Sequence, residues 1–202
     1  LAVLHDATGL STLAAEVAES PWDKGSATGT RMTRMDRLVV ALGWTRDARA
    51  LPPLLEKLRQ LDATSSFSHY RAIARALEAI GSPKAAEPLA EVLQQPDIRG
   101  HAIHSVEEAR RRDQKAMKGA TGRYTYRVRN ESLRELMLAR ALLRCGDREG
   151  LGEKVLGEYA TDLRGPIARH ATAARRCADA GNRPPAAARR HQRIGHGVGE
   201  TL

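Results

Sequence analysis

Two segments of the sequence superpose on each other without a gap. Residues 47–58 (DARALPPLLEKL) and 82–93 (SPKAAEPLAEVL) match at an offset of 35 residues. Each begins with a residue that can cap a helix N-terminus, Asp47 in one and Ser82 in the other. Each also has a proline near its first turn, where a missing N–H costs least. An internal repeat of this length restricts the chain to a stack of similar units.

Apolar residues recur in both segments at four, seven, eight and eleven positions after the cap. This spacing is one face of an α-helix. In both segments the preceding apolar run ends in a glycine, Gly43 or Gly81, the residue expected just past a helix C-terminus where φ turns positive. Each unit is therefore predicted to be two helices joined by a turn. The eight apolar positions are Leu51, Leu54, Leu55, Leu58, Ala86, Leu89, Ala90 and Leu93.

A third copy follows further along the chain. Residues 136–145 are predicted to form a helix that ends before Gly146, and Asp147 then caps a second helix. Two of the four apolar offsets in this second helix hold charged residues, so we expect it to be more exposed. The four positions are Leu151, Lys154, Val155 and Glu158.

Half of a fourth copy stands at the beginning of the chain. Asp6 is in the capping position, and all four offsets after it are apolar: Leu10, Leu13, Ala14 and Val17. The helix that would precede Asp6 is not in the sequence. Because each unit of a repeat stack contacts mainly its neighbours, we expect the array to be truncated on this side and further residues to precede Leu1 in the parent protein.

Composition agrees with an all-α fold. Of the 202 residues, 42% are apolar and only 3% are aromatic, and most of the apolar residues are Ala and Leu. Such residues favour close helix packing rather than strands. No apolar run reaches the roughly 18 residues of a membrane-spanning helix. The predicted fold is an α-solenoid of about three and a half helix pairs, with an irregular insert and a disordered tail.

These repeats resemble a known family. Residues 38–61, 76–93 and 133–159 are similar to HEAT-like repeats, particularly the bacterial kind related to phycobilisome-lyase repeats. The resemblance implies an α-α superhelix and says almost nothing about function. The strings LHDATGL (4–10) and ALLRCGD (141–147) also resemble C-terminal helical regions of bacterial FAD-dependent oxidoreductases. That second resemblance implies an FAD site in the parent protein, outside this chain, because this chain has no cofactor motif.

The array is predicted to span residues 1–174. A stretch rich in Gly, Ser and Thr, residues 20–33, is expected to be a loop with Trp22 as an anchor. The last helix is expected at 166–180. Residues 175–202 form a basic tail with almost no aliphatic side chains, and we expect it to be disordered because it cannot bury enough apolar surface.

A second interruption, the basic insert, spans residues 96–130. Within it, residues 102–118 are predicted to form a helix, and the alternation at 124–128 favours a short extended segment. The net charge of the chain is +9. Most of the excess lies in this insert and in the tail, so the high charge says little about what the repeats bind.

The beginning of the insert holds a candidate metal site. His101, His104 and Glu107 are spaced three residues apart, which would place two imidazoles and a carboxylate on one helix face. Nitrogen and oxygen donors that converge in this way can bind a transition metal, although a further ligand from elsewhere is needed. The alternative is a solvated polar face.

The insert is also a candidate for anion or nucleic-acid binding. Lys and Arg side chains bind phosphates, and tyrosines stack on bases. The alternative is a solvated surface in which Glu107 and Glu108 pair with arginines one turn later. The candidate residues are Arg110, Arg111, Arg112, Lys115, Lys118, Arg123, Tyr124, Tyr126, Arg127 and Arg129.

Catalytic signatures are missing from the sequence. It contains no GxSxG, P-loop or GxGxxG motif. The leading hypothesis is therefore a non-catalytic module that docks a protein surface or the rest of its own chain. Two alternatives remain open, an accessory domain of an FAD-dependent oxidoreductase and nucleic-acid binding through the insert.

Overall fold

The computed structural model describes residues 8–26, 29–117 and 124–179. Within these ranges the chain forms helices and no strand, which confirms the predicted all-α fold. The α-helices are α1 (Leu10–Glu19), α2 (Arg34–Trp44), α3 (Leu51–Arg59), α4 (Phe67–Ile80), α5 (Ala86–Leu93), α6 (Val106–Met117), α7 (Tyr124–Arg144), α8 (Leu151–Ala160) and α9 (Gly165–Asp179). Short 3-10 turns precede α3, α5 and α8, namely η2 (Ala48–Ala50), η3 (Pro83–Ala85) and η4 (Arg148–Gly150).

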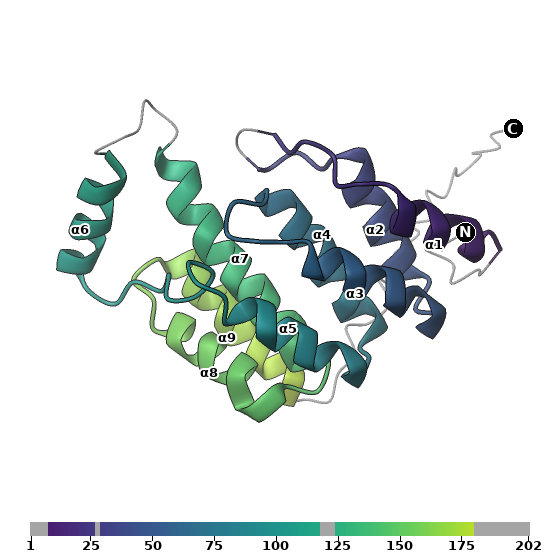
Figure 1. The fold of residues 1–202 in the computed structure, drawn as a ribbon. Helices are drawn as coiled ribbons and strands as arrows, with labels where there is room; N and C mark the ends of the chain where they lie inside the picture. Colours follow the sequence, from purple (N-terminus) through teal and green to yellow (C-terminus); the bar gives the residue numbers. More distant parts are fainter. Residues whose placement is uncertain (1–7, 27–28, 118–123, 180–202) are drawn as a thin grey trace, which may run out of the picture.

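The helices form two layers (Figure 1). One layer consists of α2, α4, α7 and α9, and α4 packs in it between α2 and α7. The other layer consists of α1, α3, α5 and α8, each of which packs against a helix of the first layer. The pairs α2–α3, α4–α5 and α7–α8 are the predicted repeat units, and α1 is the half unit before them. The architecture is an all-α solenoid.

The repeated apolar positions form the core of this solenoid. Leu54, Leu58, Leu89 and Leu93 are fully buried at equivalent places in α3 and α5. In α8 the buried face consists of Gly152, Val155, Leu156 and Tyr159, while Lys154 is exposed. Of the four positions that the repeat pattern predicts to face inward, only Val155 is fully buried, and the charged Lys154 faces solvent.

Glycines mark the turns of two units but not of the third. Gly81 and Gly146 follow α4 and α7 with φ of 63° and 106°, as predicted. The prediction for Gly43 is wrong, because α2 continues to Trp44 and Gly43 lies inside it. A Cβ at Gly43 would lie 2.3 Å from the Cα of Ala76 in α4. Gly43 is therefore needed for the close approach of two helices and not for a turn.

The predicted caps have different outcomes. Asp47 accepts a hydrogen bond of 2.8 Å from the backbone N–H of Arg49 and so caps η2. Asp147 caps α8 rather than η4, because its carboxylate accepts from the N–H groups at the start of that helix, Gly152 at 2.6 Å and Glu153 at 3.0 Å. Ser82 is at the N-cap of η3, but its side chain makes no capping hydrogen bond. Asp6 lies outside the described residues.

The basic insert departs from the prediction at both of its elements. Helix α6 begins at Val106, so residues 102–105 are not helical. Residues 124–128 are not extended but form the first turns of α7. Alternation over five residues is a weak strand signal, and here the segment continues a long helix whose later turns are fixed by packing. At the C-terminal end, α9 includes residues 175–179, and residues 180–202 lie outside the described part.

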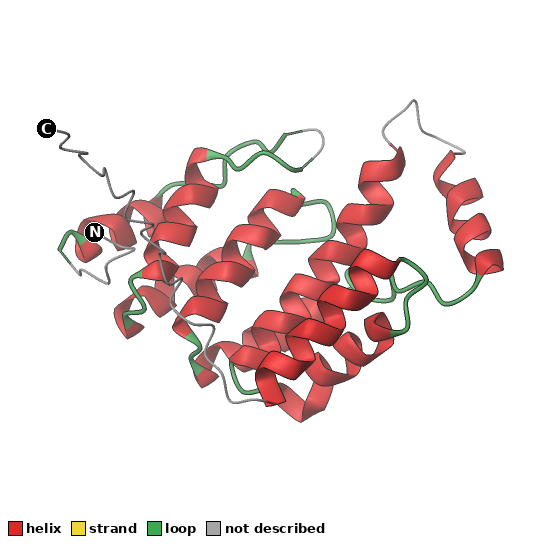
Figure 2. Ribbon diagram, turned by 180° about the vertical axis from the view of Figure 1, so that it is seen from behind, coloured by secondary structure: helices red, strands yellow, loops and turns green. Residues whose placement is uncertain are grey.

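Connections inside and between the units lie at opposite edges of the solenoid (Figure 2). Inside each pair the connection is a tight turn that contains η2, η3 or η4. The connections that precede α2, α4 and α7 are longer, and they include the predicted loop 20–33, which the structure shows without helix in its described residues. We call the edge formed by residues 20–26, 29–33, 60–66 and 94–105 the loop edge. No helix in the described ranges is both long and apolar enough to cross a bilayer.

Replacing Gly43 with alanine tests the close approach of α2 and α4. A methyl group there meets the backbone of Ala76, so we expect Gly43→Ala to lower the free energy of unfolding by about 1–3 kcal/mol in a urea titration. Gly157→Ala is the matched control, because a Cβ at Gly157 in α8 meets nothing within 4 Å. The control should gain about 0.5–1 kcal/mol from alanine's helix propensity. Equal stability of the Gly43 variant and the wild type would contradict the packing.

Candidate functional site

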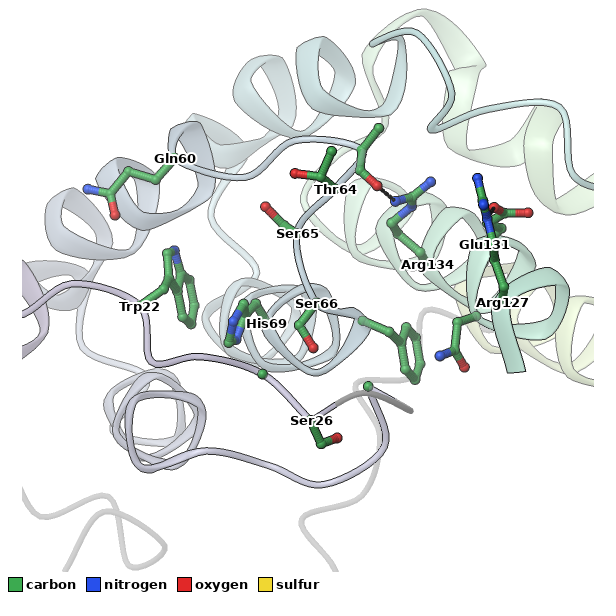
Figure 3. Close-up of a pocket in the computed structure, with 15 residues that line it drawn as sticks. Trp22, Ser26, Gln60, Thr64, Ser65, Ser66, His69, Arg127, Glu131 and Arg134 are labelled. Atoms are coloured by element: carbon green, nitrogen blue, oxygen red, sulfur yellow. Dashed lines mark hydrogen bonds and ion pairs between the residues drawn. The ribbon is translucent and has the colours of Figure 1, made fainter. Parts of the chain in front are cut away.

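Two adjoining clefts open at the loop edge. The first, of about 670 Å³, lies between the loops 20–33 and 60–66 and the N-terminal half of α7 (Figure 3). The second, of about 600 Å³, lies between loop 60–66, the segment that precedes α6, α6 itself and α7. The same residues form the boundary of both clefts, so residues from separate repeat units and from the insert meet at one place. The shared residues are Ala63, Thr64, Arg127, Glu131 and Arg134.

Loop 60–66 is held in shape by Asp62. The Asp62 carboxylate accepts hydrogen bonds from the backbone N–H groups of Thr64 at 2.9 Å and Ser65 at 3.0 Å. The Thr64 hydroxyl also donates to this carboxylate, at 2.7 Å. This bond, together with the two backbone bonds, lowers the pKa of Asp62. The buried Tyr70 donates its hydroxyl to the Asp62 carbonyl at 2.7 Å. The hydroxyl-bearing residues 64–66 are thereby fixed along the first cleft.

A buried histidine and aspartate form the wall opposite α7. His69 Nδ1 lies 2.7 Å from Asp36 Oδ1, and both side chains are buried. Burial raises the pKa of Asp36, but hydrogen bonds from His69, Thr33 and Ser68 outweigh it and hold the pKa below its ordinary value. Because the carboxylate is then ionised, His69 donates its Nδ1–H to it. Asp36 also completes a capping box with Thr33 at the start of α2.

Loop 20–33 is fastened to this wall by Trp22. Its ring stacks on His69 with centroids 4.5 Å apart, and its Nε1–H donates to the carbonyl of Lys57 at 3.3 Å. The buried Lys57 in turn donates its ammonium to the carbonyl of Ser20 at 2.6 Å. Burial lowers the pKa of Lys57. The predicted role of Trp22 as an anchor is thus what the contacts show.

Arg134 connects the two clefts. Its guanidinium donates to the carbonyl of Ala63 at 2.9 Å and to that of Asp97 at 2.6 Å, and it lies over the ring of Tyr70 at 5.2 Å. The residue is only 5% exposed. One arginine of α7 therefore holds loop 60–66 and the segment before α6 in place.

A buried glutamate on α7 fixes the far wall of the second cleft. Glu135 is fully buried and accepts hydrogen bonds from the N–H groups of Gly100 at 3.0 Å and His101 at 2.9 Å. It also accepts the Tyr159 hydroxyl at 2.6 Å. Burial, together with the charge of Glu135, raises the pKa of Tyr159. The beginning of the insert is thus attached to the repeat body through α7 and α8.

The candidate metal ligands do not come together. His101 and His104 precede α6, so they do not share a helix face with Glu107. His101 Nδ1 lies 3.8 Å from Glu131, whereas His104 Nδ1 lies 3.3 Å from the Thr161 hydroxyl. Among the described residues no group of three His, Cys, Asp or Glu side chains is placed to hold a metal ion. The sequence analysis placed the start of this helix at residue 102, four residues before its actual start at Val106. The predicted shared face of the three side chains depended on that earlier start.

The anion candidates are only partly brought together. Arg112, Lys115 and Arg127 line the second cleft, and two of them are paired: Arg112 with Glu108 at 2.6 Å and Arg127 with Glu131 at 2.9 Å. The Glu108–Arg112 pair is one of the predicted pairs. Four further candidates, whose side chains the structure describes, do not line either cleft: Arg110, Arg111, Tyr126 and Arg129. Lys118, Arg123 and the Tyr124 side chain lie outside the described part.

The sequence analysis missed several residues that shape the clefts, among them Asp36, Asp62, His69, Arg134 and Glu135. The spacing of Thr33 and Asp36 is a capping-box signature and could have identified that helix start. Nothing in the sequence distinguishes His69 or Arg134, because their roles arise from contacts with residues far away in the chain.

Comparison with known proteins agrees with the repeat geometry. Residues 70–95 match the family model of the PBS lyase HEAT-like repeat, a span that covers most of α4, the η3 turn and α5. The chain carries a HEAT-like repeat. This HEAT-like unit supplies Tyr70, which supports both Asp62 and Arg134. No curated protein and no solved structure matches the chain significantly. The resemblance to FAD-dependent oxidoreductases has no support in these comparisons.

The pH dependence of stability tests the Asp36–His69 wall. The pKa of Asp36 lies below its ordinary 3.8 in the folded state, so its carboxylate stabilises the fold above about pH 4. That contribution is lost as the pH falls through the lowered pKa. We expect Asp36→Asn to cost about 1–3 kcal/mol at pH 7 in urea unfolding, and the difference from wild type to shrink in acid. Asp113→Asn, at an exposed position of α6, should cost almost nothing. A pH-independent difference would contradict this assignment.

Proposed function

We propose that this HEAT-like module binds a segment of a protein partner, or of its own chain, in the joined clefts of the loop edge. The observation that supports the proposal is the meeting of several units there. Loop 20–33, loop 60–66, α6 and α7 all line the two clefts. A continuous surface built from successive units is how solenoids bind extended partners.

The chemistry of the clefts suits a polypeptide. Their lining offers hydroxyls, side-chain amides and guanidinium groups, which are donors for backbone carbonyls and carboxylates. Trp22 and Phe67 add aromatic surface in the first cleft. Several of these groups already make hydrogen bonds within the protein, such as Thr64 and Ser65 to Asp62 and Arg134 to two carbonyls. A site that is preformed in this way loses less free energy to ordering on binding.

Blocking the clefts tests this function. Peptides enriched from an unbiased random-sequence library against the whole chain should bind at least about tenfold more weakly to Thr64→Trp, because the exposed Thr64 lines both clefts and an indole there fills them. Lys84→Trp is the matched control, with the same indole on an exposed position of η3 at the opposite edge. Titration calorimetry gives the affinities. Enriched peptides that bind both variants equally, or a library that yields no binder, would refute docking in the clefts.

Nucleic-acid binding through α6 is the second candidate. Arg110, Arg111 and Lys115 are exposed on this helix. Helix α6 packs mainly against α7 and leaves most of its surface open. An exposed basic helix at the end of the molecule is accessible to a phosphate backbone.

A salt titration with duplex DNA decides this second candidate. If three phosphates are contacted, affinity should fall roughly 40-fold between about 50 and 200 mM salt. Replacing Arg110, Arg111 and Lys115 together with Gln should remove most of that dependence. Replacing Lys84 and Arg148 with Gln, at the opposite edge, should leave it unchanged. Binding that is insensitive to salt or to the α6 changes would argue against the candidate.

A further inference from the structure

Arg134 is a buried charge without a counter-charge. It is 5% exposed, and no described carboxylate lies within ion-pair distance of it. Arg140, on the same helix, shows the contrast, because it pairs with Glu78 at 2.6 Å. A buried ion usually needs an oppositely charged partner to offset its lost hydration. Two carbonyls and the face of Tyr70 supply only dipoles, so Arg134 has no ion-pair partner among the described residues.

Donor capacity at Arg134 is also incompletely used. A guanidinium has five N–H donors, and the hydrogen bonds to Ala63 and Asp97 use two of them. The buried Nε has no hydrogen-bond partner among the described residues. The two terminal nitrogens each keep one further N–H, and the residue lines both clefts. A ligand oxygen in the clefts could therefore accept from the guanidinium without displacing either loop.

The surroundings in the first cleft favour an anion. Arg127 lines the cleft with Arg134, and the acidic Glu131 lies beside Arg127. Glu131 is already engaged by Arg127 at 2.9 Å. Ser66 lines the same cleft at the N-cap of α4 and makes no capping hydrogen bond, so the first-turn N–H groups add a partial positive charge there.

We propose that Arg134 binds a carboxylate side chain of an acidic protein segment that docks in the first cleft. This inference rests on the proposed docking function and specifies the chemistry of the partner. A carboxylate carries the single charge that Arg134 lacks, and Arg–carboxylate hydrogen bonds are among the strongest in proteins. A phosphate would bring up to a second negative charge beside Glu131. The exposed Arg127 lines the same cleft and adds a second positive charge there.

The decisive experiment uses the whole chain and two matched probes. One is an eight-residue acetylated peptide of alternating Gly and Glu, and the other has Gln at each Glu position. Binding is followed in a Trp44→Phe background, where Trp22 in the first cleft is the remaining tryptophan and its fluorescence reports occupancy. The Arg134 Nε–H signal in a nitrogen–proton NMR spectrum reports directly on the guanidinium. We expect the Glu peptide to bind at least tenfold more tightly than the Gln peptide and to shift this signal.

Variants separate the charge from the fold. Arg134→Met should reduce affinity for the Glu peptide to that of the Gln peptide. Arg140→Met removes an arginine of α7 that lines neither cleft and should change neither affinity. If the Arg134 variant does not fold, the NMR titration of the wild-type background decides alone. Equal binding of the two peptides, or an Arg134 signal that the Glu peptide does not shift, overturns the proposal. If duplex DNA shifts that signal and the Glu peptide does not, the proposal is likewise overturned.

Failure here is distinguishable from failure of docking. Library peptides that are blocked by Thr64→Trp but indifferent to Arg134→Met would overturn the carboxylate site and leave the docking function standing. A library that yields no cleft binder, together with a Glu peptide that leaves the Arg134 signal unshifted, would reject both the docking function and the carboxylate site.

Discussion

Close helix–helix contacts at small residues set the geometry of this solenoid. Gly43 of α2 lies against Ala76 of α4, and Gly152 of α8 lies against Ala139 of α7, in both cases at distances that leave no room for a Cβ. The first contact fixes the spacing between the α2–α3 and α4–α5 units, and the second fixes the spacing of the two helices inside the α7–α8 unit. The position of every loop at the ends of these helices follows from that spacing, including the loops that form the clefts.

The two edges of the solenoid have different physical tasks. At one edge the turns are short, and helix caps such as Asp47 and Asp147 satisfy the backbone locally. At the loop edge the connections are longer, and buried side chains act there in addition to local hydrogen bonds such as those of Asp62. Asp36, Glu135 and Arg134 each bind backbone or side-chain groups far away in sequence. This is why polar groups, and with them the clefts, gather at one edge.

The sequence predicts what is periodic and local. The apolar offsets identified the buried leucines of α3 and α5, and Gly81 and Gly146 were correctly placed at turns. The prediction for Gly43 was wrong because a glycine after an apolar run has two possible roles. It can end a helix with a positive φ, or it can lie inside a helix and allow another helix to approach closely, and the sequence pattern is the same in both cases. The role of Arg134 was invisible for a related reason. It depends on carbonyls of Ala63 and Asp97, which only the stacking of units brings together.

Helix α7 joins the clefts to the far side of the molecule. It has 21 residues and therefore spans roughly 30 Å. Arg127 and Arg134 lie in its N-terminal half, while Ala139 contacts Gly152 further along. A helix is stiff along its axis. The arginines that line the clefts and the contact that sets the separation of α7 and α8 are therefore parts of one rigid element, so the position of the cleft wall is set by packing on the far side of the molecule.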